Sequence, residues 1–600
     1  MSAVRAPELL ASAYWLNVDS PLTIADQRGR FVLLDFWTFC CANCLHVLDE
    51  LRPLEAQFGD ILTVIGVHSP KFAHEADPAA LAAACERHEV LHPVVNDPEL
   101  WLWQQYAVRA WPTLVLIDPL GYVVAQAAGE GQITALAATI RALAAEHEAR
   151  GTLRRSDAPF HPLQPTSSTL RFPAKAVVLP AARTGRDADT LLVADAGQHA
   201  LVELSSDLHT PLRRIGSGVR GLRDGPAEAA QFAEPNGLAL LPAGLVEYDV
   251  VVADTANHVL RGIRLSNGAV LATIDLPAAL RAVRTITGPI PDVLSPWDVA
   301  WWPAAERLVV AAAGVHLLLS VDPVSGAAEV LAGTTVEGLR DGPAPDCWLA
   351  QPSGLAVDGS RIWFVDAETS ALRYLTLAGE LHTVVGEGLF DFGHMDGPGA
   401  DARLQHPLGV AMLADGSVAV CDTYNGAIRR YDPTTSEVST LVRDLAEPSG
   451  ALLVDGELVV IESAAHRLVR TNPAFSRVIG APLQTQRAVT DLGPGTLTLR
   501  VEFKPAPGRK LDDQFGASTR LTVSASPPEL LTDGAGDGEP LTRTLRLGAV
   551  TEGVLHITAQ AASCDQDGEH PACYLARQDW GVPIRIRADG PSELSLVLLG

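Results

Sequence analysis

The chain has 600 residues and a formal net charge of −26 at pH 7, from 45 basic and 71 acidic side chains. Such acidity repels phosphate backbones and anionic lipid headgroups, which argues against nucleic acid and membrane surfaces as partners. Hydrophobic residues make up 47% of the chain and cysteines number only eight, which excludes both a disordered protein and a disulfide scaffold. A chain of this length contains several domains.

The N-terminal twenty residues lack an apolar core of signal-peptide length, and no run approaches 18 apolar residues. We therefore expect a cytoplasmic protein without a membrane-spanning helix. Three of the eight cysteines, Cys40, Cys41 and Cys44, lie within five residues. In a reducing compartment, clustered cysteines are more typical of catalysis or metal binding than of structural disulfides.

Residues 1–150 are predicted to form an α/β domain, because apolar strands alternate with helical spacing up to an Ala-rich final helix. The buried strand Phe31–Trp37 runs into the cysteines, and a helix is predicted to start near Ala42. Cys41 would lie just before that helix, whose N-terminus stabilises a thiolate, and Cys44 one turn inside it. Such a pair, an exposed attacking thiol and a shielded resolving thiol, is typical of thiol–disulfide exchange.

The motifs DFW, CANC and VRAWPT resemble those of the thioredoxin superfamily over about residues 15–147. The resemblance implies that Cys41 attacks, Cys44 resolves, Asp35 is a buried acid that moves a proton, and Pro112 is a cis-proline that positions the substrate backbone. The chain departs from the family at Cys40, where a tryptophan is usual. This extra thiol could compete as a resolver, be glutathionylated or simply pack.

Other interpretations of the cysteines remain open. The CxxC could be half of a zinc site, although no second CxxC or CxxH lies nearby. A peroxiredoxin-like site would need a preceding proline, and Leu34 stands there. A thioredoxin-like fold kept only as a binding module, with vestigial thiols, is the strongest of these alternatives. Cys85, in an Ala-rich helical stretch, is predicted to be a core thiol.

A linker is predicted at 151–168, and a repeat follows over residues 169–480. Six segments each read as an apolar strand, a polar turn and a second strand, and several are preceded by a strand that opens with proline. Three units also carry an Asp-Gly-Pro motif whose proline lies nine residues before the strand-opening proline. Short strands in such a repeat predict a six-bladed β-propeller, and the pattern resembles NHL repeats.

An acid follows the first strand of five of the six segments. These residues are Asp195, Asp254, Asp366, Asp422 and Glu462. We expect them to be structural and to accept backbone N–H groups in the strand–strand turn.

Four histidines lie four residues after the acid position: His199, His258, His316 and His466. We expect this turn to join the outer strands of each blade, which would spread the histidines around the rim. A shared metal is therefore not predicted, nor is any cofactor. The propeller is predicted to be a platform for protein interactions, and the net acidity disfavours RNA.

Residues 481–600 show alternating strands that predict an antiparallel β-sandwich. Cys564 and Cys573 flank the sequence DQDGEHPA, and this segment resembles the β-sandwich domain of bacterial disulfide-interchange proteins. That resemblance implies two possible auxiliary thiols that relay electrons. A static bridge or two unconnected thiols remain open alternatives.

The domain order as a whole resembles the NHL repeat-containing protein 2 family, which implies a cytosolic monomer. The leading hypothesis is a thiol–disulfide oxidoreductase that acts on protein clients through Cys41 and Cys44. The alternative is a non-catalytic scaffold that binds proteins and has a vestigial thioredoxin-like site.

Overall fold

The computed structural model describes residues 4–156, 162, 164, 166–283, 292–471, 478–485, 489–505, 509–511, 517–565 and 573–599. These residues divide between two compact units. The first combines Met1–Cys85, Val90–Leu163 and Gln486–Gly600, and the second combines Glu86–Glu89 and Gln164–Thr485. Within the predicted linker, residues 157–161, 163 and 165 lie outside the described part of the chain.

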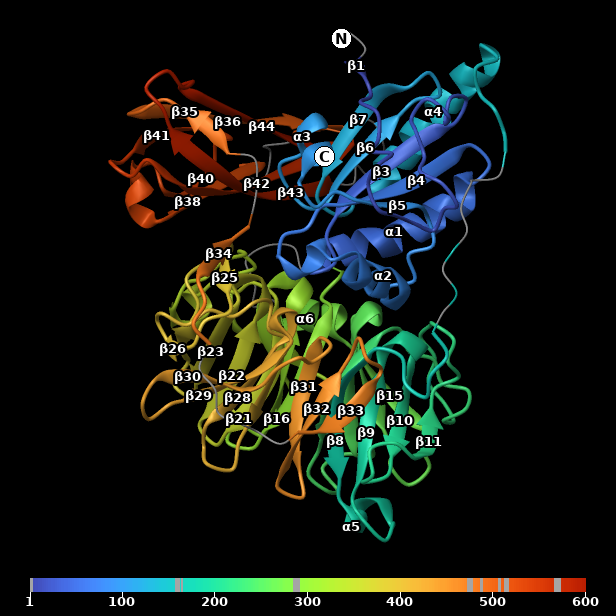
Figure 1. The fold of residues 1–600 in the computed structure, drawn as a ribbon, viewed down its shortest axis with the longest axis vertical. Coiled ribbons are helices and arrows are strands. Elements are labelled where there is room, and N and C mark those ends of the chain that lie inside the picture. The colour runs from blue at the N-terminus through green and yellow to red at the C-terminus, as the bar shows by residue number, and fades with distance from the viewer. Residues whose placement is uncertain are drawn as a thin grey trace. The chain divides into compact units, whose positions relative to one another are not determined.

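The N-terminal part of the first unit is a mixed sheet with the strand order β1-β7-β6-β3-β4-β5-β2. Its strands are β1 Val4–Arg5, β2 Trp15–Leu16, β3 Phe31–Trp37, β4 Leu62–His68, β5 Val94–Asn96, β6 Thr113–Ile117 and β7 Tyr122–Ala128. Its helices are α1 Ala42–Phe58, α2 Pro78–Arg87, α3 Trp101–Gln105 and α4 Ile133–Ala149. Strand β3 lies at the centre, parallel to β4 and antiparallel to β6 (Figure 1).

All seven residues of β3 are buried because both faces of the sheet are covered. Phe31 and Leu33 pack with side chains of α1 and α4 on one face. Leu34 and Phe36 pack on the other face with side chains of α3 and of the N-terminal segment. A continuous apolar run is typical of a strand covered on both sides. The end of β3 therefore delivers the cysteine segment from a rigid, central element.

The second unit contains a series of antiparallel sheets in which strands adjacent in sequence are hydrogen-bonded neighbours. The first three sheets are β8 Pro173–Leu179, β9 Thr190–Asp195, β10 Ala200–Leu204 and β11 Pro211–Ile215; β12 Pro235–Leu240, β13 Val250–Asp254, β14 Val259–Ile263 and β15 Val270–Asp275; and β16 Pro296–Trp302, β17 Arg307–Ala312, β18 Leu317–Val321 and β19 Ala328–Ala332. Two short helices, α5 Ala181–Thr184 and α6 Leu276–Val283, interrupt them.

The next three sheets follow the same plan, except that the two-residue strand that opens the fourth sheet, and the one that opens the fifth, pairs with the last strand of its sheet. They are β20 Gly342–Pro343, β21 Pro352–Asp358, β22 Arg361–Asp366, β23 Ala371–Thr376 and β24 Glu380–Val385; β26 Gly397–Pro398, β27 Gly409–Met412, β28 Val418–Asp422, β29 Ala427–Asp432 and β30 Glu437–Val442; and β31 Pro448–Val454, β32 Glu457–Glu462 and β33 Arg467–Arg470. A separate pair joins β25 Asp391–Gly393 to β34 Pro482–Gln484.

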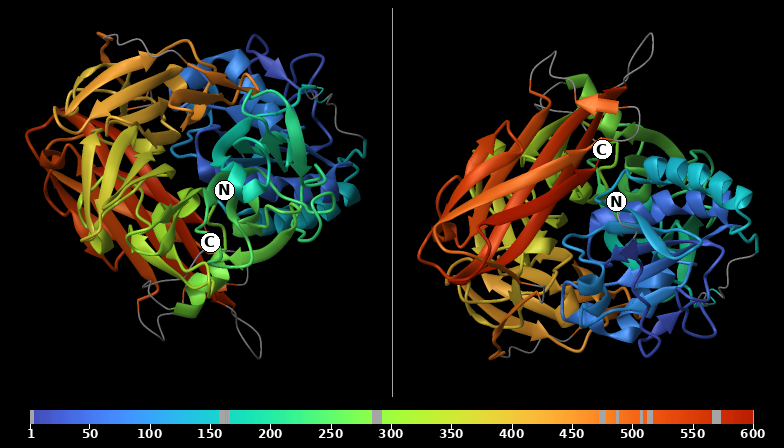
Figure 2. Two further views of the ribbon diagram at one scale, coloured as in Figure 1. Left: turned by 90° about the horizontal axis from the view of Figure 1, so that it is seen from below. Right: turned by 90° about the horizontal axis from the view of Figure 1, so that it is seen from above.

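One edge strand of each sheet, called its first strand below, contacts that of the next sheet in the order β8, β12, β16, β21, β27 and β31, and β31 also contacts β8. In the left view of Figure 2 these sheets follow one another around the unit in the colour order of the chain. The polar turn of each repeat joins the second and third strands of its meander, for example β9 and β10, and both are interior strands in the first five sheets. The expectation that it joins outer strands was wrong, because the second and third strands of a four-stranded meander lie in its middle.

One ion pair lies where these first strands meet. At the second residue after the strand-opening proline, four sheets carry glycine, whereas β8 carries Lys175 and β16 carries Asp298. The Lys175 ammonium lies 4.0 Å from the Asp298 carboxylate and donates to the carbonyls of Leu408 and Ser449 at 2.6 and 3.1 Å. Asp298 accepts the Leu355 N–H at 2.8 Å.

The second sheet also reaches this pair. A Cβ atom added to Gly237 of β12 would lie 2.3 Å from the Asp298 carboxylate, so the glycine leaves the space that the acid fills. The Lys175–Asp298 pair therefore contacts all six sheets at one point.

The C-terminal part of the first unit has two sheets, β35-β43-β42-β38-β40 with β37 beside β42, and β39-β41-β36-β44. The strands are β35 Thr490–Leu492, β36 Thr496–Lys504, β37 Arg509–Leu511, β38 Thr519–Ser526, β39 Leu531–Asp533, β40 Gly536–Gly538, β41 Thr542–Leu547, β42 Glu552–Asp565, β43 Cys573–Ile586 and β44 Glu593–Leu599. Both sheets contribute side chains to one apolar cluster.

Two pairs in this region, β35 with β43 and β36 with β44, are parallel. The prediction of a wholly antiparallel arrangement was wrong for these pairs, because alternation within a strand reports its two faces and not the direction of its neighbour. None of the described helices is long and apolar enough to cross a membrane.

Candidate active site

Cys41 and Cys44 lie at the start of α1, directly after the central strand. Cys41 is the N-cap residue, with extended backbone angles, and its Sγ accepts the N–H of Cys44 at 3.4 Å. The Cys41 side chain is half-buried and that of Cys44 is fully buried, and both are free thiols. No acidic residue lies in the first turn of the helix. The helix N-terminus therefore offers unopposed partial positive charge to a thiolate on Cys41.

Cys44 is a poor thiolate in this state. Burial raises its pKa well above its usual value, and the neighbouring Cys41 raises it further, while a backbone hydrogen bond from Thr38 opposes them. An accessible Cys41 and a shielded Cys44 form the asymmetric pair that exchange needs. Cys44 must lose a proton before it can act as a nucleophile, so a nearby base is required.

Asp35, on β3, is fully buried. Burial raises its pKa to about 8, with a smaller contribution from the charge of Glu55. Neither of its carboxylate oxygens has a hydrogen-bond partner among the described residues. The charge of Asp35 is one of the influences that raise the pKa of Cys44, so the two groups interact. An acid with a pKa near neutrality and free oxygens can both hold and release a proton.

Pro112 follows a cis peptide bond after Trp111. The Pro112 carbonyl accepts the N–H of Gly129 at 2.9 Å. The next residue, Glu130, pairs with His46 of α1 at 2.6 Å. The proline segment and the cysteine helix are thus held by the same loop. Sequence reasoning did not identify His46 or Glu130.

The remaining cysteines separate into two groups. Cys40, Cys85, Cys347 and Cys421 are buried and form no disulfide. Burial raises the pKa values of Cys85, Cys347 and Cys421, which makes them unreactive packing thiols at neutral pH. Cys564 is disulfide-bonded, and it lies directly opposite Cys573 in the register of β42 and β43.

The five repeat acids of the second unit each accept one backbone N–H. The donors, in chain order, are Arg171, Ala233, Ala350, Gln405 and Ala446, at 2.6 to 2.9 Å. Each donor lies two residues before the strand-opening proline, so the bond fastens the entry of the first strand to the end of the second. The donors therefore lie outside the strand–strand turn, and the expectation that they lie within it was wrong.

Three buried arginines complete this arrangement and were missed by sequence reasoning. Arg261, Arg373 and Arg429 each lie seven residues after a repeat acid and bind it at 2.6 to 2.7 Å. Each also binds the aspartate of an Asp-Gly-Pro motif, namely Asp224, Asp341 and Asp396 respectively, at 2.6 to 3.0 Å. The sequence carries a signal for this arrangement. An arginine stands seven residues after the repeat acid in the three units that have an Asp-Gly-Pro motif, and in none of the other units.

The four repeat histidines join neighbouring sheets. The Nδ1 atoms of His199, His258, His316 and His466 accept the backbone N–H groups of Glu234, Ser295, Gln351 and Phe172, respectively, at 3.0 to 3.3 Å. In the fourth sheet Ser370 takes the histidine's place, and its hydroxyl accepts the N–H of His406 at 3.2 Å. One nitrogen of each histidine is thus committed to packing the sheets together.

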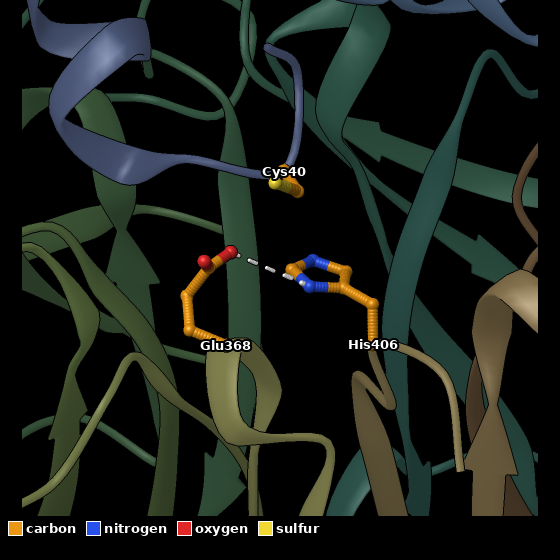
Figure 3. A group of neighbouring side chains, drawn as sticks. All are labelled: Cys40, Glu368 and His406. Atoms are coloured by element: carbon orange, nitrogen blue, oxygen red, sulfur yellow. Dashed lines mark ion pairs between the residues drawn. The ribbon is translucent and has the colours of Figure 1, made fainter. Parts of the chain in front are cut away.

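His406 itself faces an acid of the preceding sheet. Figure 3 shows its ring beside Glu368, with Nδ1 3.7 Å from the carboxylate. The His406 ring stacks on Tyr424 with 4.5 Å between centroids. Both members of the pair are buried.

Two regions of the chain match known protein families. A thioredoxin-like family model matches residues 29–123, and an NHL repeat model matches residues 404–431. The Protein SUPPRESSOR OF QUENCHING 1, chloroplastic, of Arabidopsis thaliana is 32% identical over 511 residues, which is 78% of this chain and 46% of that protein. NHL repeat-containing protein 2 of Gallus gallus is 33% identical over 479 residues, which is 73% of this chain and 63% of that protein.

A third relative matches the N-terminal part alone. The thiol-disulfide oxidoreductase YkuV of Bacillus subtilis is 24% identical over 143 residues, which is 24% of this chain and 95% of that protein. The chain therefore spans about half to two thirds of the longer relatives and contains almost the whole length of the short one.

These matches confirm the family resemblance seen in the sequence. The N-terminal α/β part is thioredoxin-like, and the second unit is a multi-sheet β domain that contains a match to the NHL repeat model. The chain is a homologue of the proteins named NHL repeat-containing protein 2, with a thioredoxin-like region and an NHL repeat.

Proposed function

We propose that the chain is a cytoplasmic, monomeric thiol–disulfide oxidoreductase that acts on protein clients through Cys41 and Cys44. The observation that carries the proposal is the position of Cys41 as the N-cap of α1, with its Sγ held at the Cys44 N–H. The unpartnered, buried Asp35 supplies the base that Cys44 needs. A short relative named as a thiol-disulfide oxidoreductase supports the same activity.

The reaction follows from the asymmetry of the two thiols. The Cys41 thiolate attacks a client disulfide, which forms a Cys41–client disulfide and releases one client thiolate. The Cys44 thiol transfers its proton to the Asp35 carboxylate, and the resulting thiolate attacks the Cys41 sulfur. This step releases the second client thiolate and leaves a Cys41–Cys44 disulfide. Two electrons have passed to the client, and a dithiol reductant must restore the pair.

The remaining parts are proposed to hold the client. We take the second unit as a six-bladed β-propeller that serves as a protein-interaction platform, because six first strands are neighbours in a cycle and meet at the Lys175–Asp298 pair. We take the C-terminal part as a β-sandwich, because its two sheets share one apolar cluster.

The test is to trap the client. Cys44→Ser removes the resolving thiol, so a client should remain attached to Cys41 as a stable mixed disulfide. The full-length variant is expressed in cells, free thiols are blocked with acid and alkylating agent, and attached proteins are identified after non-reducing electrophoresis. The matched control is the Cys41→Ser, Cys44→Ser double variant, which should capture nothing through cysteine.

Recovery of reducible partners by Cys44→Ser but not by the double variant would support the oxidoreductase. The result that would overturn it is an equal set of partners with both variants, none of them released by reductant. That outcome would favour the alternative, a non-catalytic scaffold with a vestigial thioredoxin-like site.

A further inference from the structure

Glu75 holds the segment that leads into the cysteine pair. It lies in the short 3₁₀ turn η1, His74–Ala76, and is fully buried. One carboxylate oxygen accepts the hydroxyl of Thr38 at 2.7 Å and the N–H of Cys40 at 2.9 Å. The other accepts the N–H groups of Lys71 and Phe72, each at 2.9 Å.

This carboxylate joins two chain segments that leave the sheet at the same edge. Residues 38–40 follow β3 and residues 71–72 follow β4, and these two strands are parallel neighbours. A carboxylate is the side chain suited to this place, because it accepts four hydrogen bonds and donates none. Bonds to a buried charged acceptor are among the stronger ones in proteins, so the two segments are rigidly connected.

The connection determines where the two adjacent thiols point. The N–H of Cys40 is bound to Glu75, and the Cys40 Sγ lies 3.9 Å from the Thr38 hydroxyl. The next residue, Cys41, donates its N–H to the Thr38 carbonyl at 3.4 Å and turns its own Sγ to the helix N-terminus. Cys40 is thereby kept on the Thr38 side of the loop, while Cys41 reaches the exchange position.

We propose that Glu75 is a positioning residue for disulfide exchange, which fixes Thr38–Cys40 so that Cys41, and not Cys40, is the attacking thiol. This inference rests on the proposed oxidoreductase function. Its role is indirect, through the backbone of the preceding segment, and a small displacement of a nucleophile is enough to lower a reaction rate strongly.

The substitution that tests the proposal is Glu75→Gln. It keeps the size of the side chain but replaces one acceptor oxygen with an NH₂ group. An NH₂ group cannot accept the two hydrogen bonds that this oxygen accepted, so either residues 38–40 or residues 71–72 lose their attachment. We expect the rate of insulin disulfide reduction to fall roughly ten- to hundredfold. We also expect the rate at which iodoacetamide alkylates Cys41 to fall relative to that of Cys40, measured by mass spectrometry of the full-length reduced protein.

A matched control is available in the same domain. Asp97 is also a buried carboxylate, and it accepts the N–H groups of Trp101, Leu102 and Trp103 at 2.8 to 3.1 Å. Asp97→Asn should lower the melting temperature and leave the ratio of Cys41 to Cys40 alkylation unchanged. If Glu75→Gln does not fold, Thr38→Val removes one of the four donors and should change the ratio in the same direction, by less.

The alkylation ratio separates this inference from the proposed function. If the wild-type protein shows no Cys41-dependent insulin reduction, the oxidoreductase proposal fails, but the ratio still reports on Glu75. An unchanged ratio in folded Glu75→Gln, or an equal change in Asp97→Asn, would overturn the positioning role.

Discussion

Asp35 stands out among single residues because it is ionisable, buried and without a hydrogen-bond partner in the described part of the chain. Burial first, and the charge of Glu55 second, raise its pKa to about 8, against about 4 in an unfolded chain. The folded state thus holds this proton more tightly than the unfolded state. The free energy of unfolding therefore falls as the pH rises from about 4 to about 8.

Asp35→Asn should remove this dependence, since an amide cannot ionise. We expect the variant to be more stable than the wild type by roughly 3 to 5 kcal/mol at pH 8 and equally stable near pH 4. Urea denaturation at the two pH values measures the difference. The variant should also resolve the Cys41–client disulfide more slowly. A stability difference that does not change with pH would show that Asp35 is ionised in the folded protein.

Among single residues, the sequence could predict the positions of those whose surroundings depend on nearby residues in the chain. The helix start beside Cys41 followed from an apolar strand that meets helical periodicity, and the structure has the N-cap at that residue. Glu75 could not be found in this way. It lies 35 residues from its partner Cys40, and a glutamate before a predicted helix looks like an ordinary surface residue.

Buried ion pairs stabilise the single sheets of the second unit. In the fourth sheet Arg373 lies between Asp366 and Asp341, and its side chain is completely buried. Removing the arginine would leave Asp366 as an uncompensated buried charge, which typically costs several kcal/mol. The repeat acids themselves already lie in an unfavourable environment, since burial raises the pKa of Asp366.

Arg373→Met should therefore lower the free energy of unfolding by about 3 to 5 kcal/mol. Chemical denaturation followed by circular dichroism checks this value. Arg150→Met is the control, because the Arg150 pair with Glu146 is largely exposed, and it should leave the transition unchanged. A similar effect of both substitutions would mean that the buried pair contributes no more than a surface pair.

The elements of this unit could be predicted better than their connections. Strands and turns were visible as repeats, but the partners within a sheet were not. Arg261 and Asp224, for example, are 37 residues apart. The turn was assigned to the outer strands because periodicity locates strands without giving their order in the sheet.

For the whole molecule, the largest departure from sequence reasoning concerns the two ends of the chain. The thioredoxin-like part and the C-terminal β part belong to one compact unit, although the whole repeat separates them in sequence. Ala110, two residues before Pro112, is a member of the apolar cluster of the C-terminal part. Contacts across such a separation leave no periodic signal in a single sequence.

The Lys175–Asp298 pair offers a test of how the second unit is held together. Burial raises the pKa of Asp298 to about 6, and Lys175 is the first of the groups that oppose the shift. Lys175→Met should destabilise the protein by about 3 kcal/mol at pH 7.5, because a buried carboxylate loses its cation. Asp298→Asn in the same background should recover part of the loss.

A double-mutant cycle from denaturation curves measures this coupling. Strict additivity of the two substitutions would show that the lysine acts through its carbonyl contacts alone.

The repeats differ in the residue that stands two positions after the strand-opening proline, and this difference limits how the second unit can evolve. Gene duplication changes repeat number easily when every repeat is equivalent at its contacts. Here one repeat supplies a cation and another an anion, and Gly237 of a third repeat leaves the space that the anion fills. Loss of a repeat would delete a charge or leave a void, and gain of one would move the charges apart. The unequal charges thus favour the present number and order of repeats over a shorter or longer series.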